Sequence, residues 1–441
     1  MTASLLQVVI SLVVGIALII LLTTKYRVHA FFALLLACFI VGFGVQMPPA
    51  NIIVSVKEGF GNIMRSLGLI IVLGTTLGIL LEHTGSTRVM AAFILKKCGE
   101  RHAPLAMSIT GFIVGLPIFC DSGYIVLSGL NQSLAKRTGI SVVIMSVSLA
   151  TGLYSVHCLL PPHPGATAAA GTIGADFGKL ILIGIAVAIP AMLVGYWWAK
   201  YAGKKFQGSN AGEEINEPLI NQPPVLNAFL PVILPIILIA TNSFVVMEKN
   251  NEAVWSKVLS VLGDPVIALS IGVILCFNNG RHWNRNVVGK LLTESAEKAG
   301  AILVIIGAGG AFGAVLAATK LGQHFGNAVP LSSLGILFPF LLTFILKTAQ
   351  GSSTVAIITA AAIVLPLLPS LGLDTDNGKL LCVLSMGAGS MMISHANDAY
   401  FWVIAKFSGL EMKAMLKVYS VATLWMGLVS LGMVYIISFL L

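Results

Sequence analysis

The sequence predicts an all-α polytopic membrane protein with two inverted-topology repeats, each of about five transmembrane helices plus one re-entrant hairpin. Three observations support this fold class. Hydrophobic residues make up 57% of the 441-residue chain and charged residues only 10%, whereas soluble domains carry about 25% charged residues. Apolar runs of membrane-spanning length recur along the chain, and a series of polar motifs occurs twice in the same order.

Ten apolar runs are predicted to cross the membrane, because about 20 apolar residues in a helix span its hydrocarbon core. They are residues 4–22, 29–47, 66–82, 141–159, 178–199, 227–247, 264–278, 300–318, 379–396 and 417–440. The first run has neither a basic leader nor a small-residue cleavage site. We therefore expect it to be kept as a helix and not removed as a signal peptide.

Two further apolar stretches, residues 103–135 and 332–369, are each interrupted in the middle by a polar cluster. The clusters are FCDSG at 119–123 and QGSST at 350–354. Backbone that leaves the helix at membrane depth must be covered by protein or face a watery cavity. Both stretches are therefore predicted to be re-entrant hairpins that enter and leave on the same side.

Lys and Arg residues cluster in the connections between these runs. The net charge of +9 is therefore attributed to cytoplasmic loops under the positive-inside rule and not to nucleic-acid binding. This orientation places both termini on the external side. The polar segment 201–226 is predicted to be a cytoplasmic linker between a first repeat, residues 1–200, and a second, residues 227–441.

The case for a repeat rests on matches at an offset of about 235 residues. LGTTLGILL (73–81) matches GGAFGAVL (309–316), and SLATGLYSVH (148–157) matches SMGAGSMMISH (385–395). The two polar clusters of the hairpins also correspond in position. An odd number of spans in each half inverts the second copy, which is the plan of many secondary transporters. Chance similarity between glycine-rich packing motifs is the alternative.

Four breaks in the predicted helices are candidates for a binding site: PIFCDSG (117–123), HCLLPPHPG (157–165), QGSST (350–354) and SHAND (394–398). Pro161, Pro162 and Pro164 must interrupt a helix. Exposed helix N-termini attract carboxylates without a buried lysine. Ser, Thr and Asn side chains supply the donors and acceptors that a polyhydroxylated acid requires. The breaks therefore point to a site for a small hydroxylated carboxylate.

Candidate substrate-binding residues follow from these breaks, with helix capping or bonding to the same helix as the alternative for the hydroxyl groups. They are Ser122, His157, His163, Gly165, Gly351, Ser352, Ser353, Thr354, Ser394, His395 and Asn397. The six cysteines are scattered without a paired spacing. We therefore expect no disulfide framework, no metal site and no cofactor.

Asp121 and Asp398 are the acids placed well inside broken membrane segments. A charge at that depth is expensive and points to function, although either carboxylate is also suited to capping a helix N-terminus. Histidine titrates near neutral pH. We therefore expect Asp121, Asp398 and His157 to carry out proton coupling. For each histidine, a structural hydrogen bond is the alternative.

HCLLPPHPG, GAGGAFGAVL, QGSSTVAIITA and SHANDAYFW together resemble the gluconate permease family (GntP type) of bacterial inner-membrane symporters, over nearly the whole chain. The resemblance implies proton-coupled uptake of gluconate or related sugar acids, or of D-serine in one branch. It also implies inverted repeats, paired hairpins, a homodimer and an elevator-type movement. Family members have Glu-Val at the first hairpin tip, where this chain has Asp121-Ser122.

Three other functions compete with proton symport. A sodium-coupled organic-anion transporter would hold its ion at the GSST and SHAND motifs. An intramembrane hydrolase is disfavoured, because the sequence contains neither a nucleophile elbow nor an HExxH motif. A channel is disfavoured, because no repeated filter sequence or charge ring is visible.

Overall fold

The computed structural model describes residues 4–206, 222–247, 254–278, 283–319 and 333–441. Every regular element within these ranges is helical. Of the predicted linker, residues 207–221 lie outside the described residues, as does residue 332 at the start of the second predicted hairpin. All six cysteines are free thiols.

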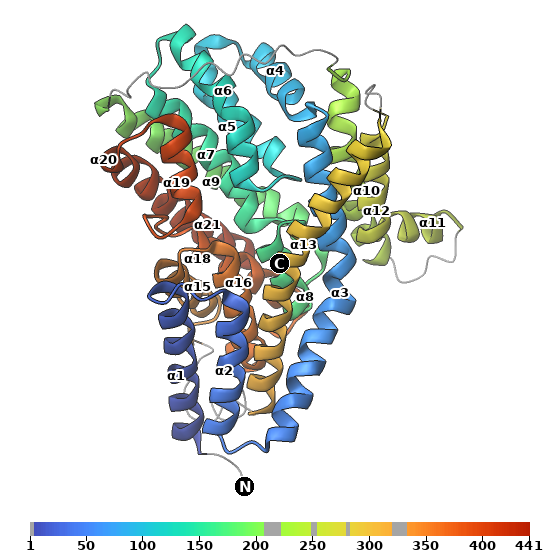
Figure 1. Ribbon diagram of the computed structural model, residues 1–441, viewed down its shortest axis with the longest axis vertical. Helices are drawn as coiled ribbons and strands as arrows, with labels where there is room; N and C mark the ends of the chain where they lie inside the picture. The colour runs from blue at the N-terminus through green and yellow to red at the C-terminus, as the bar shows by residue number, and fades with distance from the viewer. Residues whose placement is uncertain (1–3, 207–221, 248–253, 279–282, 320–332) are drawn as a thin grey trace.

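The helices of the first half lead from the N-terminus to the predicted linker (Figure 1). They are α1 (Leu5–Thr24), α2 (Ala30–Gly44), α3 (Pro49–His83), α4 (Ser86–Cys98), α5 (Ala103–Gly115), α6 (Cys120–Thr138), α7 (Val142–Leu159), α8 (Pro164–Ile173) and α9 (Phe177–Ala202). Short 3-10 turns, η1 (Glu100–His102) and η2 (Gly203–Lys205), precede α5 and follow α9.

The second half begins with α10 (Val225–Met247), α11 (Val254–Leu262), α12 (Pro265–Cys276) and α13 (Arg285–Ala318). It continues with α15 (Leu337–Gln350), α16 (Ser353–Val364), η4 (Leu365–Leu367), α17 (Leu368–Leu371), α18 (Asp376–Met391) and α19 (Ala399–Ser408). The last elements are α20 (Met412–Ala414), the π-helical turn η5 (Met415–Ser420) and α21 (Val421–Ser438).

Among the described residues, eight helical segments are long and apolar enough to cross a membrane, against the ten spans predicted. The predicted spans 29–47 and 264–278 correspond to α2 and α12, which are shorter apolar helices. The predicted span 379–396 corresponds to α18, which ends at Met391 and has 16 residues. Segment Ser353–Leu371, predicted as the second arm of a hairpin, is one of the eight. The chain is therefore a polytopic helical membrane protein, with a different division of its apolar segments from the predicted one.

Helices α3 and α13 are much longer than the spans predicted at 66–82 and 300–318. They contain 35 and 34 residues, so each is about 50 Å long at 1.5 Å per residue. In α3 the charged residues Lys57, Glu58 and Arg65 end the apolar run, but their side chains are exposed and the helix continues past them. The prediction located the apolar part of each helix and missed its polar extension.

The two long helices cross in direct contact, as Figure 1 shows. The crossing depends on glycine, because a Cβ atom at Gly59 would lie 2.4 Å from the Gly310 carbonyl oxygen. Beyond the crossing, α3 packs against the first-half breaks. A Cβ atom at Gly74 would lie 3.0 Å from Pro162, and one at Gly78 would lie 2.8 Å from the Pro117 carbonyl oxygen. The long helices thus support the interrupted ones.

Four pairs of helices are separated by short non-helical breaks, close to the positions that the sequence predicted. The pairs are α5–α6, α7–α8, α15–α16 and α18–α19, with breaks at residues 116–119, 160–163, 351–352 and 392–398. The first break lies slightly before the predicted cluster at 119–123, so that Asp121 belongs to the first turn of α6. Helix α5 packs on α7 and α15 packs on α18, while α8 contacts α16 and α19 contacts α6. Elements of the two halves are thereby interleaved.

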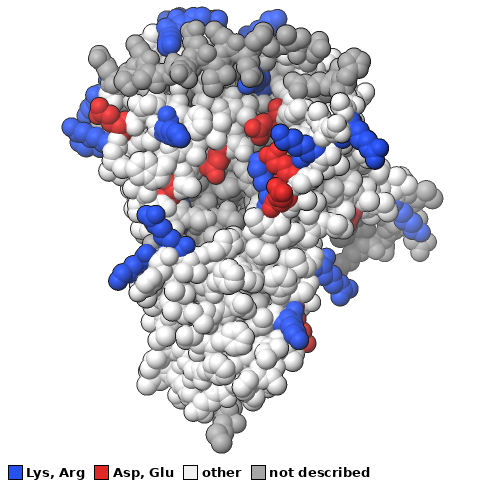
Figure 2. Space-filling view, in the orientation of Figure 1, with Lys and Arg blue, Asp and Glu red and all other residues white. Residues whose placement is uncertain are grey.

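Charged side chains are unevenly distributed on the face shown in Figure 2. They gather in the upper half, while the lower part, over α1, α2 and α3, is almost entirely uncharged. Large apolar side chains are exposed on these helices, among them Leu6, Ile10, Phe32 and Phe43. An uncharged surface rich in exposed apolar groups is suited to contact with lipid.

Candidate functional site

The candidate site lies where helices of both halves begin next to one another. Ser352 caps α16, and its Oγ accepts a hydrogen bond from the Val355 amide at 3.3 Å. His163 occupies the cap position of α8. A Cβ atom at Gly165 would lie 3.3 Å from Thr354 Cα, so the first turns of α8 and α16 are in contact. Two helix N-termini at one place create a region of positive potential suited to an anion.

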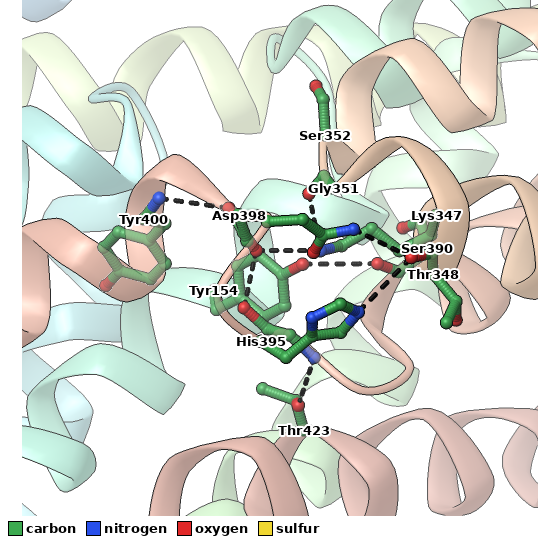
Figure 3. A network of polar contacts seen from close by, with 12 residues as sticks. Tyr154, Lys347, Thr348, Gly351, Ser352, Ser390, His395, Asp398, Tyr400 and Thr423 are labelled. Atoms are coloured by element: carbon green, nitrogen blue, oxygen red, sulfur yellow. Dashed lines mark hydrogen bonds and ion pairs between the residues drawn. The ribbon is translucent and has the colours of Figure 1, made fainter. Parts of the chain in front are cut away.

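A buried ion pair joins the two second-half breaks, as Figure 3 shows. Lys347, on α15, has no exposed surface. Its Nζ donates hydrogen bonds to Asp398 Oδ2 at 2.8 Å and to the Gly351 carbonyl oxygen at 2.6 Å. Asp398 Oδ2 also accepts a hydrogen bond from Ser394 Oγ at 2.5 Å, and its Oδ1 caps α19 by accepting from the Tyr400 amide at 3.0 Å.

The same two breaks are held together by main-chain carbonyl groups. Asn397 Nδ2 donates to the Thr348 carbonyl oxygen at 2.8 Å, and His395 Nε2 lies 3.3 Å from that oxygen. Gly351 adopts a left-handed conformation with φ +84°, and a Cβ atom there would lie 2.1 Å from the Asn397 carbonyl oxygen. Only glycine allows this close approach.

The predicted histidines of the first half lie next to each other. The His157 and His163 ring centroids are 4.8 Å apart. His163 is buried, and its Nε2 donates to the Gly115 carbonyl oxygen at the end of α5, 2.6 Å away. His157 stacks on Tyr154, whose hydroxyl donates to the Ser390 carbonyl oxygen on α18 at 3.2 Å. The imidazole of His163 therefore joins the α7–α8 break to the end of α5.

Asp121 differs from Asp398 in its surroundings. Its half-buried carboxylate lies in the first turn of α6, and Cys120 Sγ is 3.8 Å from Oδ1. Among the described residues, no Lys, Arg or His side chain forms an ion pair with Asp121. The two acids therefore differ in their partners: Asp398 is paired with a lysine, and Asp121 has no cationic partner in the described part of the chain.

Several buried polar atoms near the breaks have no hydrogen-bond partner in the protein. They are both amide atoms of the Gln350 side chain, the Thr348 hydroxyl, His157 Nδ1 and the Tyr419 hydroxyl. Each such group costs about 1–3 kcal/mol when it is left unsatisfied in a dry interior. Other unpartnered polar groups are spread through the helices, but those of Thr348 and Gln350 at the end of α15 and of His157 at the end of α7 lie next to breaks, where a hydroxylated ligand could satisfy them.

The structure brings most of the predicted residues together. Thr354 lies beside Gly165, and Ser394, His395, Asn397 and Asp398 surround the end of α15. Ser122 follows Asp121 and is half-buried. Ser352 caps its own helix, the alternative role considered for the hydroxyl groups. Asp398 likewise caps α19.

The sequence analysis missed Lys347, Gln350 and Tyr154. Lys347 left a signal, since it is the single charged residue in the apolar helix LFPFLLTFILKTAQ. The expectation that the breaks would need no buried lysine is incomplete, because this ammonium group lies beside them. Gln350 directly precedes the GSST motif, and Tyr154 lies one helical turn before His157.

Comparisons with known proteins find relatives over nearly the whole chain. The GntP family permease profile matches residues 7–440. The chain is 32% identical to a gluconate permease of Pseudomonas aeruginosa, with 96% of each chain covered. It is also 32% identical to the D-serine transporter DsdX of Escherichia coli O6:H1, covering 98% of this chain and 99% of the relative. A high-affinity gluconate transporter of Escherichia coli K12 is 30% identical, with 92% and 94% covered.

Solved structures show the same fold at much lower sequence identity. The YdaH transporter of Alcanivorax borkumensis superposes with a TM-score of 0.65 at 17% identity, covering 87% of this chain and 88% of that one. MtrF of Neisseria gonorrhoeae superposes with a TM-score of 0.61 at 15% identity, covering 88% and 84%. The relatives are permeases and transporters, not enzymes, and the helical fold with its interrupted helices suits the same role. The chain belongs to the GntP family of permeases.

Proposed function

We propose that this permease imports gluconate or a related small sugar acid by proton symport across the bacterial inner membrane. The observation that carries the proposal is the meeting of the α8 and α16 N-termini beside buried, unpartnered polar groups. An anion is stabilised at helix N-termini. Hydroxyl groups of the same molecule would satisfy the Gln350 amide and the Thr348 hydroxyl.

Within this proposal, the substrate carboxylate lies against the first turn of α16, where Ser353 and Thr354 follow the Ser352 cap. Ser122 and His157 face the polyol portion. Asp121 binds the transported proton, because it has no cationic partner among the described residues and a neutral acid is less costly at this depth. Coupling then requires that the proton affinity of Asp121 depend on whether substrate is bound.

The proposal also includes the repeat architecture that the sequence predicts. The repeated order of a long helix, an interrupted pair and a second interrupted pair supports two inverted-topology repeats. The pairs α5–α6 and α15–α16 are proposed to be re-entrant hairpins. Substrate movement is proposed to be of the elevator type in a homodimer, with both termini on the periplasmic side.

D-serine is the alternative substrate, because the gluconate permease and the D-serine transporter match this chain at equal identity. Both ligands carry a carboxylate for the helix N-termini and at least one hydroxyl group. D-serine differs by its single hydroxyl and by its ammonium group. Sodium coupling is the alternative to proton coupling.

The test is uptake into proteoliposomes that contain the full-length chain. Labelled gluconate and labelled D-serine are supplied under an inward proton gradient, an inward sodium gradient, or neither. We expect proton-driven gluconate accumulation that an uncoupler abolishes and that replacing sodium by choline leaves unchanged. Accumulation of D-serine alone would overturn gluconate as the proposed substrate. Accumulation that requires sodium would overturn the proton as the proposed coupling ion.

A further inference from the structure

Lys347 lies at a position that is unusual for a lysine in a membrane protein. Its side chain is fully buried, on an apolar helix, and ends between two breaks. A charge inside the membrane is costly enough that function is the default explanation. Figure 3 shows its amine pointing at the Asp398 carboxylate and at Gly351, in the break between α15 and α16.

The groups around the Lys347 ammonium are oxygen atoms of the kind that bind a metal cation. Nζ contacts one carboxylate oxygen, from Asp398, and one main-chain carbonyl oxygen, from Gly351. The Ser394 hydroxyl donates a hydrogen bond to the same carboxylate oxygen. Carboxylates, carbonyls and hydroxyls that converge where helices are interrupted are the usual ligands of coupling ions in transporters with broken helices.

The carbonyl contact separates this arrangement from an ordinary ion pair. The Gly351 carbonyl is freed because α15 ends there with a left-handed glycine. That conformation turns the carbonyl oxygen toward Nζ, 2.6 Å away. A lysine that served only to neutralise Asp398 would not need a second oxygen from the break.

We propose that the Lys347 ammonium is a built-in cation, which fills the position between Asp398 and the Gly351 carbonyl that a coupling sodium ion would otherwise occupy. The proposal rests on the proposed transport function and deepens it, because it gives a structural reason why substrate binding needs no sodium. A tethered cation keeps the end of α15 and the 394–398 break in place in every state of the cycle. Asp121 is then the acid available for the transported proton.

The first experiment tests cation requirements through stability, independently of any substrate. The purified chain is melted in sodium, potassium, methylammonium or choline chloride, as wild type and as Lys347→Ala. We expect the wild type to melt at the same temperature in all four salts. The variant should melt lower in choline and recover in sodium or methylammonium, which are small enough to enter the space left by the side chain. If sodium raised the melting temperature of the wild type as much as that of Lys347→Ala, a separate sodium site would exist and the proposal would be overturned.

The second experiment tests transport. Lys347→Met keeps much of the side-chain volume but removes the charge, and Lys347→Met combined with Asp398→Asn removes both charges, so that no unpaired carboxylate disturbs folding. We expect substrate exchange to fall at least about tenfold in both, because removing one partner of a buried pair is strongly unfavourable and the double variant still lacks the cation. Lys347→Ala should regain exchange when methylammonium or sodium is added.

Lys298→Met is the matched control, because Lys298 also forms an ion pair on a helix, but its pair with Glu294 is exposed and lies in the polar part of α13. It should behave as wild type in every salt. Normal accumulation by Lys347→Met, or by the double variant, would show that the ammonium is dispensable and would overturn the proposal. If the wild type carried neither gluconate nor D-serine, the transport proposal would fail, while the melting experiment would still decide the role of Lys347.

Discussion

The two hairpin-like pairs, α5–α6 and α15–α16, are interrupted at similar positions but differ in their charges. The first places Asp121 just after its break, without a basic partner among the described residues. The second places Lys347 just before its break, paired with Asp398. An ion pair with further hydrogen bonds is fixed in geometry, whereas an unpaired carboxylate at the same depth is free to gain or lose a proton. We infer that the second break is the rigid part of the site and that the first is the part that changes state.

The largest expected effect concerns the ion pair at the α15–α16 break. Lys347→Met should lower the free energy of unfolding by about 3–5 kcal/mol, because it leaves the Asp398 charge buried and unpaired. Adding Asp398→Asn should restore much of that loss. Thermal unfolding in detergent of the two single variants and the double variant measures the coupling. Additive effects of the two substitutions would show that the pair does not organise the break.

A second large effect is expected at the tight turn of the same break. Gly351→Ala places a methyl group 2.1 Å from the Asn397 carbonyl oxygen at φ +84°, so it should destabilise by more than about 1 kcal/mol. Gly61→Ala is the control, because no atom beyond the adjoining backbone of its own helix lies within 4 Å of the position of its Cβ. That substitution should be neutral or stabilise by up to about 1 kcal/mol, as for alanine replacing glycine in a helix. Equal melting temperatures for both variants would contradict the close approach.

At the α5–α6 break, Asp121→Asn should affect transport much more than stability. The neutral amide has the same shape as the protonated acid and leaves no ion pair broken, so the unfolding free energy should change by less than about 1 kcal/mol. Proton-driven accumulation should be lost while exchange of labelled for unlabelled substrate persists. Both readouts come from the same proteoliposomes. Accumulation at the wild-type level would remove Asp121 from the coupling mechanism.

The smallest effect is expected at an exposed pair, which sharpens the comparison with the buried one. Glu294 and Lys298 are 3.1 Å apart on α13, and their side chains are about two-fifths exposed. Lys298→Gln should change the unfolding free energy by no more than about 0.5 kcal/mol, because water screens such pairs. A loss as large as that of Lys347→Met would mean that burial is not what distinguishes the two lysines.

Local composition was sufficient to locate the breaks. Pro161 and Pro162 lie in the break after α7, and Pro164 is the first residue of α8, a position that proline tolerates. Gly351 followed by three hydroxyl residues favours an interruption. The end of α7 and the break between α15 and α16 were predicted closely for that reason. The extensions of α3 and α13 were missed, because a hydropathy pattern detects where a helix meets lipid and not where it ends.

The ion pair was not predictable in the same way. Lys347 and Asp398 are 51 residues apart, and nothing in either local sequence specifies the partner. A charge at membrane depth points to function whichever its sign, and Lys347 meets that criterion as well as the acids do. Gln350 is neutral and stands at the edge of a motif, so its sequence carries no such signal. Its unsatisfied atoms appear only when the surrounding packing is known.

Main-chain carbonyl groups form much of the candidate site, and this affects how it should be probed. The Gly115, Thr348 and Gly351 carbonyl oxygens receive the His163, Asn397 and Lys347 side chains. Alanine scanning leaves a carbonyl group in place at every position, so it will record the donors and overlook the acceptors. Replacing the amide by an ester at the peptide bond that follows Gly351 would weaken that carbonyl as an acceptor while keeping the glycine. In this permease, backbone chemistry is accordingly as informative a target for mutagenesis as the side chains.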